Sequence, residues 1–276
     1  MDDLAPGPKP VPALVRAKRI LDDLSLDGKA KGVSDIARNL ALPKSTVHGL
    51  CRTLEELGLL VRTGANQFTV GPHVLAWANA YQSQSSLPQA FMELAEQAGM
   101  RSQSINLSIP SGHEVMYIAC RQGSDPLGVS FRPGLRLPAP FTATGKAMLA
   151  TMSDAEVREL FAQRWPDAWT PSSVPDIDAL LAELVVTRAR GYSLDDGQLR
   201  ESMTCFGAPV FGAGSVSAVA GVAIGVLTAD SDEDAFDSIA ATVTQLAAQL
   251  TRRLGGRPRT DLPREPEHSL TAARSS

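Results

Sequence analysis

The stretch from Val33 to Val70 constrains this chain more than any other, because its pattern of apolar and turn-forming residues fits few structures. It predicts a short helix, a tight break, a longer helix and two short strands, in this order: Ser34–Leu40, Ala41–Pro43, Lys44–Leu57, Leu59–Arg62 and Gln67–Val70. Two helices at a tight turn followed by a strand hairpin make up a winged helix-turn-helix, whose second helix enters the major groove of DNA. The stretch therefore predicts a DNA-binding unit.

The ends of these elements carry local signals. Ser34 is expected to cap the first helix by accepting a hydrogen bond from a free N–H group. Gly58 can end the second helix in the left-handed conformation, and Gly64 and Asn66 can supply the positive φ angles of a hairpin turn. Along the second helix, an apolar stripe at helical spacing is expected to face the other helices: Val47, Leu50, Cys51, Leu54 and Leu57.

The opposite face of the second helix is polar. Its N-terminal half is expected to enter the major groove, while the wing touches the DNA backbone or the minor groove. The candidate DNA-binding residues are Ser34, Lys44, Ser45, Thr46, His48, Arg52 and Arg62. The alternative is a small helical core that binds no DNA, in which His48 and Arg52 are only solvated.

The charge distribution agrees with a DNA-binding front part. The net charge of −4 by itself argues against nucleic acid as a partner. However, residues 12–85 carry nine Lys and Arg against six Asp and Glu, whereas residues 86–258 carry thirteen against nineteen. A basic N-terminal part and an acidic C-terminal part are typical of a DNA-binding unit attached to a domain with another task. Because the basic excess is small, two copies on a two-fold DNA site are expected to be needed for useful affinity.

No metal or cofactor is expected. The three cysteines (Cys51, Cys120 and Cys205) show no metal-ligand spacing, and the four histidines do not cluster with them. Their odd number and scatter indicate reduced thiols in a cytoplasmic protein. The acidic, proline-rich N-terminus does not resemble a signal peptide.

One uncharged run, Met203 to Ala229, is long enough to span a membrane, but glycines and a proline interrupt it. The cluster Gly212-Ala213-Gly214 indicates a turn. The run is therefore predicted to form two buried strands, Cys205–Phe211 and Val216–Leu227, which pair as a hairpin in the middle of a sheet, and no membrane partner is expected.

The length of 276 residues suits two domains of the α+β class. The predicted boundaries are a disordered lead (1–10), a winged helix-turn-helix domain (11–71), a linker helix (72–86), a second domain (87–255) and a disordered tail (256–276).

The first helix, Val11–Ser25, is expected to face the core with Leu14, Ala17, Leu21 and Leu24. The linker helix has an apolar face of Val74, Leu75, Trp77, Ala78 and Tyr81. The second domain alternates helices with a mostly antiparallel sheet, and its expected elements are Leu87–Ala98, Ser102–Ile109, Glu114–Arg121, a helix from Thr144, Asp154–Gln163, Asp176–Arg190 and Asp234–Leu254.

Three segments share patterns with a known family. Residues 34–60 (SDIARNLALPKSTVHGLCRTLEELGLL), residues 137–150 (LPAPFTATGKAMLA), and GYSLDD at 191–196 followed by CFGAPVF at 205–211 occur in the order typical of that family. The chain thereby resembles the IclR family of bacterial transcriptional regulators over roughly residues 11–255. It departs from the family at Gly49, where Arg is usual on the second helix, which can shift DNA contact toward Arg52. It departs again at Gly197-Gln198, where an acidic pair is usual.

The resemblance implies that the second domain is a GAF-like effector-binding domain and that two chains, or two dimers, associate. It assigns effector contact to the matching positions Val129, Ala143, Thr144, Asp195, Met203, Cys205, Ala223 and Gly225. Phe131 is expected in an apolar wall with Val129 and Met203, and Asp195 at the rim. Gly145 belongs to the start of a helix whose free N–H groups favour an anion. Family members often carry Ser at positions 223 and 225, so the small apolar residues here favour a bulkier effector, such as an aromatic acid or a derivative.

Each of these residues also has a purely structural interpretation. Thr142 and Thr144 can be helix caps, and Cys205 a small buried hydrophobe. Asp195-Asp196 can form a solvated turn, and Lys146 can lie at the surface or between helices. The Gly145-Lys146 pair is not a nucleotide-binding loop, because Pro140 and Ala147 replace residues that such a loop requires.

The sequence therefore predicts a ligand-responsive DNA-binding transcriptional regulator, namely a repressor of a catabolic operon, that is not an enzyme. One alternative is a protein-docking module without specific DNA binding. A less favoured one is an enzyme that uses Cys205 and Asp195, since no histidine lies near either in a catalytic pattern.

Overall fold

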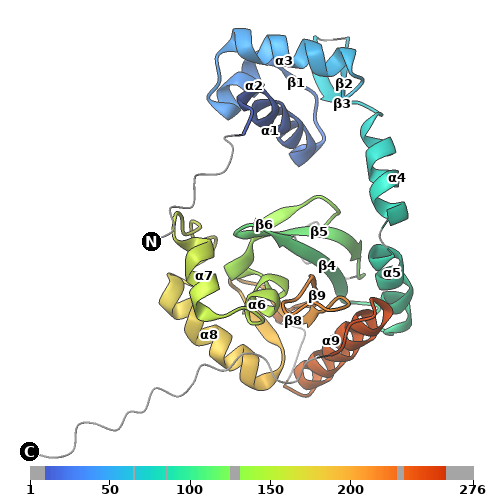
Figure 1. Cartoon of the computed structure of the whole chain (residues 1–276), viewed down its shortest axis with the longest axis vertical. Coiled ribbons are helices and arrows are strands. Elements are labelled where there is room, and N and C mark those ends of the chain that lie inside the picture. The colour runs from blue at the N-terminus through green and yellow to red at the C-terminus, as the bar shows by residue number, and fades with distance from the viewer. Residues whose placement is uncertain (1–9, 65, 85, 125–130, 229–232, 259–276) are drawn as a thin grey trace, which may run out of the picture. The chain divides into compact units, whose positions relative to one another are not determined.

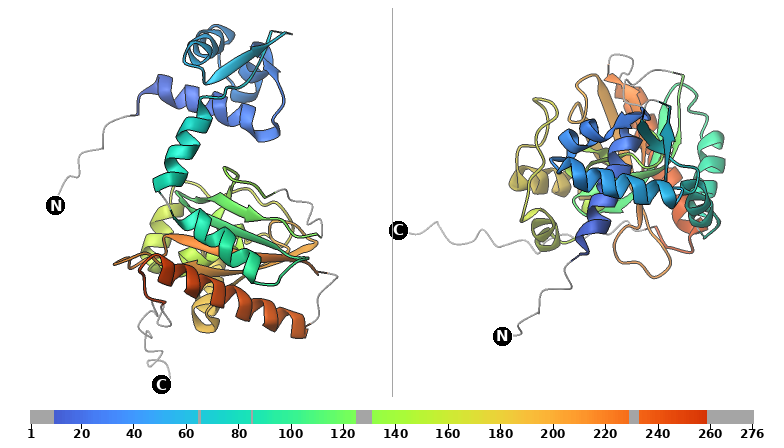
Figure 2. Two further views of the ribbon diagram at one scale, coloured as in Figure 1. Left: turned by 90° about the vertical axis from the view of Figure 1, so that its right-hand side faces the viewer. Right: turned by 90° about the horizontal axis from the view of Figure 1, so that it is seen from above.

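The computed structural model describes residues 10–64, 66–84, 86–124, 131–228 and 233–258. The chain divides into two compact units, residues 1–85 and 86–276. Helices predominate in the first unit, and the second combines helices with a large antiparallel sheet, so the predicted α+β class is confirmed (Figures 1 and 2). No helix in the described ranges combines the length and the apolar character needed to cross a membrane.

The first unit is a three-helix core with a small sheet. Its elements are α1 (Pro12–Asp27), β1 (Lys31–Gly32), α2 (Val33–Leu40), α3 (Lys44–Glu56), β2 (Leu60–Thr63), β3 (Gln67–Val70) and α4 (Val74–Gln84). The predicted wing hairpin is β2–β3, and β1 adds a third strand that pairs with Gln67 and Phe68. Two residues are too few for a strand pattern, so the sequence could not show β1. The core contains Ile20, Ile36, Val47, Cys51 and Phe68, all fully buried or nearly so.

Several local expectations for the first unit are wrong. Ser34 does not cap α2, because the helix begins at Val33 directly after β1 and Gly32 is its N-cap. Leu57 ends α3 as its C-cap and is 58% exposed. Leu14 is 69% exposed, whereas Leu24 is buried as predicted and Ile20, outside the predicted stripe, is completely buried.

The turns agree more closely with the sequence. Ala41 takes a left-handed φ of 53° at the break between α2 and α3, and Gly58 takes 71° after α3. In the wing turn, Asn66 takes a φ of 56°, whereas the φ of Gly64 lies outside the left-handed region. Asn66 therefore meets the expectation for this turn, and Gly64 does not.

The second unit begins with α5 (Leu87–Gln97) and ends with α9 (Glu233–Arg253). Its six strands pair in the order β6-β5-β4-β9-β8-β7, all antiparallel. They are β4 (Ser104–Ser111), β5 (Glu114–Arg121), β6 (Arg136–Pro138), β7 (Ser193–Asp196), β8 (Met203–Val210) and β9 (Ala220–Leu227). The predicted hairpin is β8–β9 and lies inside the sheet, as expected. The sequence did not reveal the short edge strands β6 and β7.

Helices cover both faces of this sheet (Figure 2). On one face, α5 and α9 enclose an apolar core that includes Ile105, Phe206 and Val222. The other face packs against the 3-10 turn Ala139–Phe141 and the helices α6 (Ala143–Leu149), α7 (Asp154–Phe161) and α8 (Ile177–Arg190). Because both faces are buried, the central strand β9 is continuously apolar, whereas its neighbour β4 alternates polar with apolar residues.

Candidate functional site

The first candidate site is the exposed face of α3. The helix begins at Lys44 after Pro43 and buries Val47, Cys51 and Leu54 in the core. The opposite side chains, those of Lys44, Ser45, His48 and Arg52, are exposed, and Thr46 is half-buried. Ser34 on α2 is also exposed. The predicted polar face therefore exists and is open to a partner.

Burial raises the pKa of Cys51 to about 11, so its thiol stays protonated at neutral pH and acts as a core residue.

Both candidate arginines already have acidic partners. Arg52 pairs with Glu56 one turn along α3, at 3.1 Å between Nε and Oε1, with both side chains exposed. Arg62 on β2 donates to both carboxylate oxygens of Glu55, at 3.2 and 2.8 Å, and to Asn66 Oδ1 at 3.0 Å. The hydrogen bond to Glu55 also raises the pKa of Arg62. Arg62 therefore ties the wing to α3, and a phosphate would have to compete with Glu55 for it.

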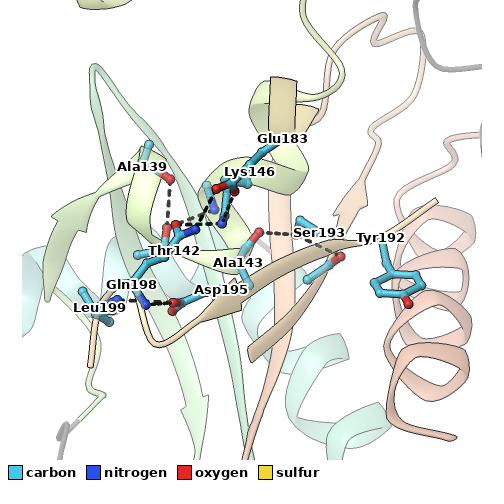
Figure 3. A network of polar contacts seen from close by, with 12 residues as sticks. Ala139, Thr142, Ala143, Lys146, Glu183, Tyr192, Ser193, Asp195, Gln198 and Leu199 are labelled. Atoms are coloured by element: carbon cyan, nitrogen blue, oxygen red, sulfur yellow. Dashed lines mark hydrogen bonds and ion pairs between the residues drawn. The ribbon is translucent and has the colours of Figure 1, made fainter. Parts of the chain in front are cut away.

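The second candidate site lies under α6, on the sheet face opposite α5 and α9. Thr142 caps α6, because its hydroxyl accepts a hydrogen bond from the backbone N–H of Gly145 at 3.1 Å (Figure 3). The helix-cap interpretation is thus confirmed for Thr142.

Two glycines of the sheet let the backbone of α6 rest directly on it, and a third lets α6 approach the 3-10 turn Ala139–Phe141. A Cβ at Gly207 would lie 2.4 Å from the carbonyl oxygen of Ala143, and one at Gly221 would lie 2.6 Å from that of Thr144. A Cβ at Gly145 would lie 2.2 Å from the carbonyl oxygen of Ala139. Close packing therefore explains Gly145 without any ligand, and its effector contact stays a prediction.

Lys146 lies in the interior, and the surface interpretation is wrong for it. Its side chain is completely buried, and its Nζ lies 2.7 Å from Glu183 Oε2 on α8 and 2.8 Å from Gln198 Oε1 (Figure 3). Gln198 closes the triangle by donating to Glu183 at 2.8 Å. Burial lowers the pKa of Lys146, and the neighbouring Glu183 opposes that shift. The ammonium is therefore already compensated within the protein.

Asp195 is also interior, so the predicted rim position and the alternative of a solvated turn are both wrong. It lies on β7, which pairs with β8 and brings Asp195 beside Cys205. Its side chain is 1% exposed, and Oδ1 accepts hydrogen bonds from the N–H groups of Gln198 and Leu199 at 2.9 and 3.2 Å (Figure 3). Burial raises the pKa of Asp195 from its ordinary value of 3.8 to about 7.

The strand register brings most predicted effector residues to this one face. Cys205 pairs with Asp195 on one side and with Gly225 on the other. The same apolar cluster contains Phe131, Ala143, Met203, Cys205 and Ala223. Val129 lies outside the described residues.

Sequence reasoning missed two polar residues on the same face, Asn106 and Ser108 of β4. Their partners in the ladder with β9 are Ala223 and Gly221. Asn106 Oδ1, Ser108 Oγ and Thr144 Oγ1 are all buried and have no hydrogen-bond partner among the described residues. The available signal was the alternation of Ser104, Asn106 and Ser108 with apolar Ile105 and Leu107, since alternate residues of a strand share a face.

A winged helix-turn-helix with an exposed polar face on its second helix is typical of DNA-binding transcriptional regulators. The model described as "Bacterial transcriptional regulator IclR C-terminal" matches residues 84–252, and that of the "IclR helix-turn-helix domain" matches residues 13–64. The chain belongs to the IclR family of transcriptional regulators.

Individual relatives span nearly the whole chain. The regulator XynR of Escherichia coli (strain K12) is 27% identical over 247 residues, which cover 89% of this chain and 98% of XynR. The crystal structure of the repressor BlcR from Agobacterium tumefaciens is 40% identical, with a TM-score of 0.59, and the match covers 90% of this chain and 98% of BlcR. An IclR homologue from Microbacterium hydrocarbonoxydans, solved with 4-hydroxybenzoate, matches the fold with a TM-score of 0.70 at 21% identity, over 87% of this chain and 99% of its own. The relatives are named as regulators, and the chain is a regulator rather than an enzyme.

Proposed function

We propose that this regulator is a repressor of a catabolic operon whose α3 enters the major groove of operator DNA. The observation that carries this proposal is the exposure of one polar face of α3, with Lys44, Ser45, His48 and Arg52 on it, while the opposite face is buried. In this arrangement the first turns of the helix reach the base edges. BlcR is named a repressor, and this supports repression rather than activation for the present chain.

In the proposed complex, Thr46 enters the major groove with the other residues of this face, and Ser34 also contacts the DNA. The wing lies against the backbone or the minor groove through Arg62. Its bidentate pair with Glu55 holds the guanidinium beside α3, so the wing and the recognition helix approach the duplex as one rigid surface.

Two chains are proposed to pair through α1 and α4, and two dimers to join as a tetramer. Within the described part of the first unit, the apolar face of α4 stays open: Leu75 is 68%, Trp77 53% and Tyr81 44% exposed. Leu14 and Val15 on α1 are also exposed. Large apolar side chains gathered in this way are typical of a protein interface. A dimer would place two recognition helices on a two-fold operator.

The proposed effector is a small organic or aromatic acid, or a derivative of one, bound beneath α6. Its contacts would be Phe131, Ala143, Thr144, Asp195, Met203, Cys205, Ala223 and Gly225, with Val129 from the segment outside the described residues. Support comes from the unpaired polar groups on this face and from the 4-hydroxybenzoate bound to the Microbacterium homologue. Effector binding would change the operator affinity through a coupling of about 1–3 kcal/mol.

The test is fluorescence anisotropy with DNA from upstream of the gene and of its neighbours, titrated with salt. A specific complex whose affinity falls steeply with salt is expected, since each neutralised phosphate adds a slope of about −0.9. If no fragment binds more tightly than random DNA at low salt, the protein-docking alternative is favoured. Burial raises the pKa of Cys205 far above its ordinary value, which removes the nucleophile from the enzyme alternative.

A further inference from the structure

We infer that the effector places an uncharged hydrogen-bonding group, a hydroxyl or a carboxamide, against Asn106, Ser108 and Thr144. This inference rests on the proposed function, because it names the chemistry of the effector that the second unit is proposed to bind.

The three groups are unsatisfied in the protein without a ligand. Asn106 is 2%, Ser108 0% and Thr144 1% exposed, and one oxygen of each has no hydrogen-bond partner among the described residues. A folded chain rarely leaves buried polar atoms unpaired, because each one loses its hydrogen bonds to water on folding. Three such atoms in one place indicate a site for a partner that supplies those bonds.

The three groups are neighbours. Asn106 and Ser108 are two residues apart on β4, so both side chains face the α6 side of the sheet. Ser108 pairs with Gly221 on β9, and Thr144 lies directly over Gly221, where an added Cβ would come within 3.1 Å of the Thr144 side chain. On the other side, Ser108 pairs with Tyr117 on β5, whose phenol lies close to the Thr144 side chain but outside the geometry of a hydrogen bond. The three side chains therefore face one region of the interior, between β4 and α6.

The surrounding charges disfavour a carboxylate at this place. Within the described residues, the buried cationic side chains are Lys146 and Arg188. Lys146 is paired with Glu183 and Gln198. Arg188 donates to the carbonyl oxygens of Ala150 and Met152 and pairs with Asp154.

The half-buried Arg121 lies on the other side of the sheet, because its ladder partner is Ile105, whose side chain belongs to the core under α5. An effector carboxylate would thus meet the interior Asp195 without a free cation nearby. Burying an unpaired charge costs much more than burying a hydrogen-bonded neutral group.

The first test needs no ligand. Asn106→Leu, Ser108→Ala and Thr144→Val each replace an unpaired polar group with an apolar one of similar size. Thr142→Val is the matched control, because the Thr142 hydroxyl does have a partner as the cap of α6. If the three groups serve a ligand, their variants should leave the thermal midpoint of the full-length protein unchanged or raise it by up to about 3 °C, whereas the control should lower it by about 2–4 °C. Three variants that lose as much as the control would overturn the inference, because the groups would then be structural.

The second test compares matched probes by calorimetry: benzoate, benzamide and benzyl alcohol, then propionate, propionamide and propanol. The amide or alcohol of a skeleton should bind about tenfold or more tightly than the acid, and Ser108→Ala should reduce that preference. Tighter binding of the acid overturns the inference.

The two tests also separate this inference from the proposed function. An acid that binds best and releases operator DNA leaves the proposed function standing. If the protein binds the amide best but shows no specific operator affinity, the inference stands and the proposed function fails. If no probe binds, the stability comparison alone decides.

Discussion

Gly49 shows how a single residue weakens an element in the place where function is expected. It lies exposed in α3, and a Cβ built there meets no atom within 4 Å. Its φ lies outside the left-handed region, so no backbone requirement explains the glycine. The cost is the higher conformational entropy that glycine loses when a helix forms.

Gly49→Ala is therefore expected to stabilise the first unit by about 0.8–1 kcal/mol, as measured by urea unfolding of the whole protein. Gly58→Ala is the matched control and should destabilise it, because Gly58 has a φ of 71°. A destabilised Gly49→Ala variant would show that α3 makes a contact at this position that the fold of one chain does not contain.

Because Gly49 stands where the family usually has Arg, the DNA contact is expected to come from Arg52 instead. We expect Arg52→Ala to weaken operator binding by about 1–3 kcal/mol if the guanidinium contacts a base, as measured by fluorescence anisotropy. Arg158→Ala removes an equal charge from an exposed arginine of the second unit and should leave the affinity unchanged. Equal affinities of the Arg52 and Arg158 variants would remove Arg52 from the site.

Asp195 makes stability depend on pH. Burial raises the pKa of its carboxyl to about 7, with Lys146 opposing the shift and Asp196 adding to it. An acid whose folded pKa lies above its unfolded value stabilises the fold below the unfolded value, here 3.8, and this contribution is lost as the pH rises through about 7. Cys205 and Tyr117 face the same region, but burial raises both of their pKa values, so they stay neutral in this range.

Asp195→Asn keeps an oxygen that can accept from Gln198 and Leu199 and removes the charge. The variant should match the wild type near pH 4 and be more stable near pH 8, by up to about 4 kcal/mol. Chemical unfolding at several pH values measures the difference. Parallel pH profiles for the two proteins would show that Asp195 does not titrate in this range.

At the scale of elements, glycines decide how α6 sits on the sheet. The backbone of α6 contacts the backbones of β8 and β9 directly, because Gly207 and Gly221 have no side chain that would separate them. The sequence pattern placed the helix and the hairpin correctly, but their direct contact depends on residues far apart in the chain. The short strand β7 is recognisable only through its pairing with the neighbouring β8.

Gly207→Ala should consequently destabilise the second unit by at least about 1–3 kcal/mol, since the new methyl group meets backbone that cannot turn away. Thermal unfolding reports the loss, and Gly49→Ala serves as a control for the same chemical change in open space. Wild-type stability would mean that α6 can lift from the sheet at little cost.

At the scale of the whole molecule, the basic excess of residues 12–85 is modest, so we proposed that self-association contributes to DNA binding. We expect the pair Leu75→Glu and Trp77→Glu to shift the protein toward monomer in light scattering and to weaken operator binding. Val185→Glu and Val186→Glu, on exposed positions of α8, control for the added charge. A variant at α4 that keeps both the assembly and the affinity of the wild type would exclude this helix from the interface.

Much of the first unit was determined by the sequence alone. The helical period of α3, the break at Pro43 and the turn-forming residues of the wing are local features, and local features act through neighbours along the chain. The exact helix start at Val33 escaped prediction, because β1 sets it through pairing with β3.

Tertiary structure decided the chemistry of the second unit. Lys146 is paired rather than solvated because Glu183 and Gln198, 37 and 52 residues along the chain, fold against it. Whether Asn106 and Ser108 find partners depends on β9, a strand about a hundred residues away. Hydrogen bonds and burial are properties of groups that meet in space, and residue type and period do not record which groups will meet. The winged helix-turn-helix could therefore be found in the sequence, whereas the unpaired polar groups beneath α6 became visible only in the fold.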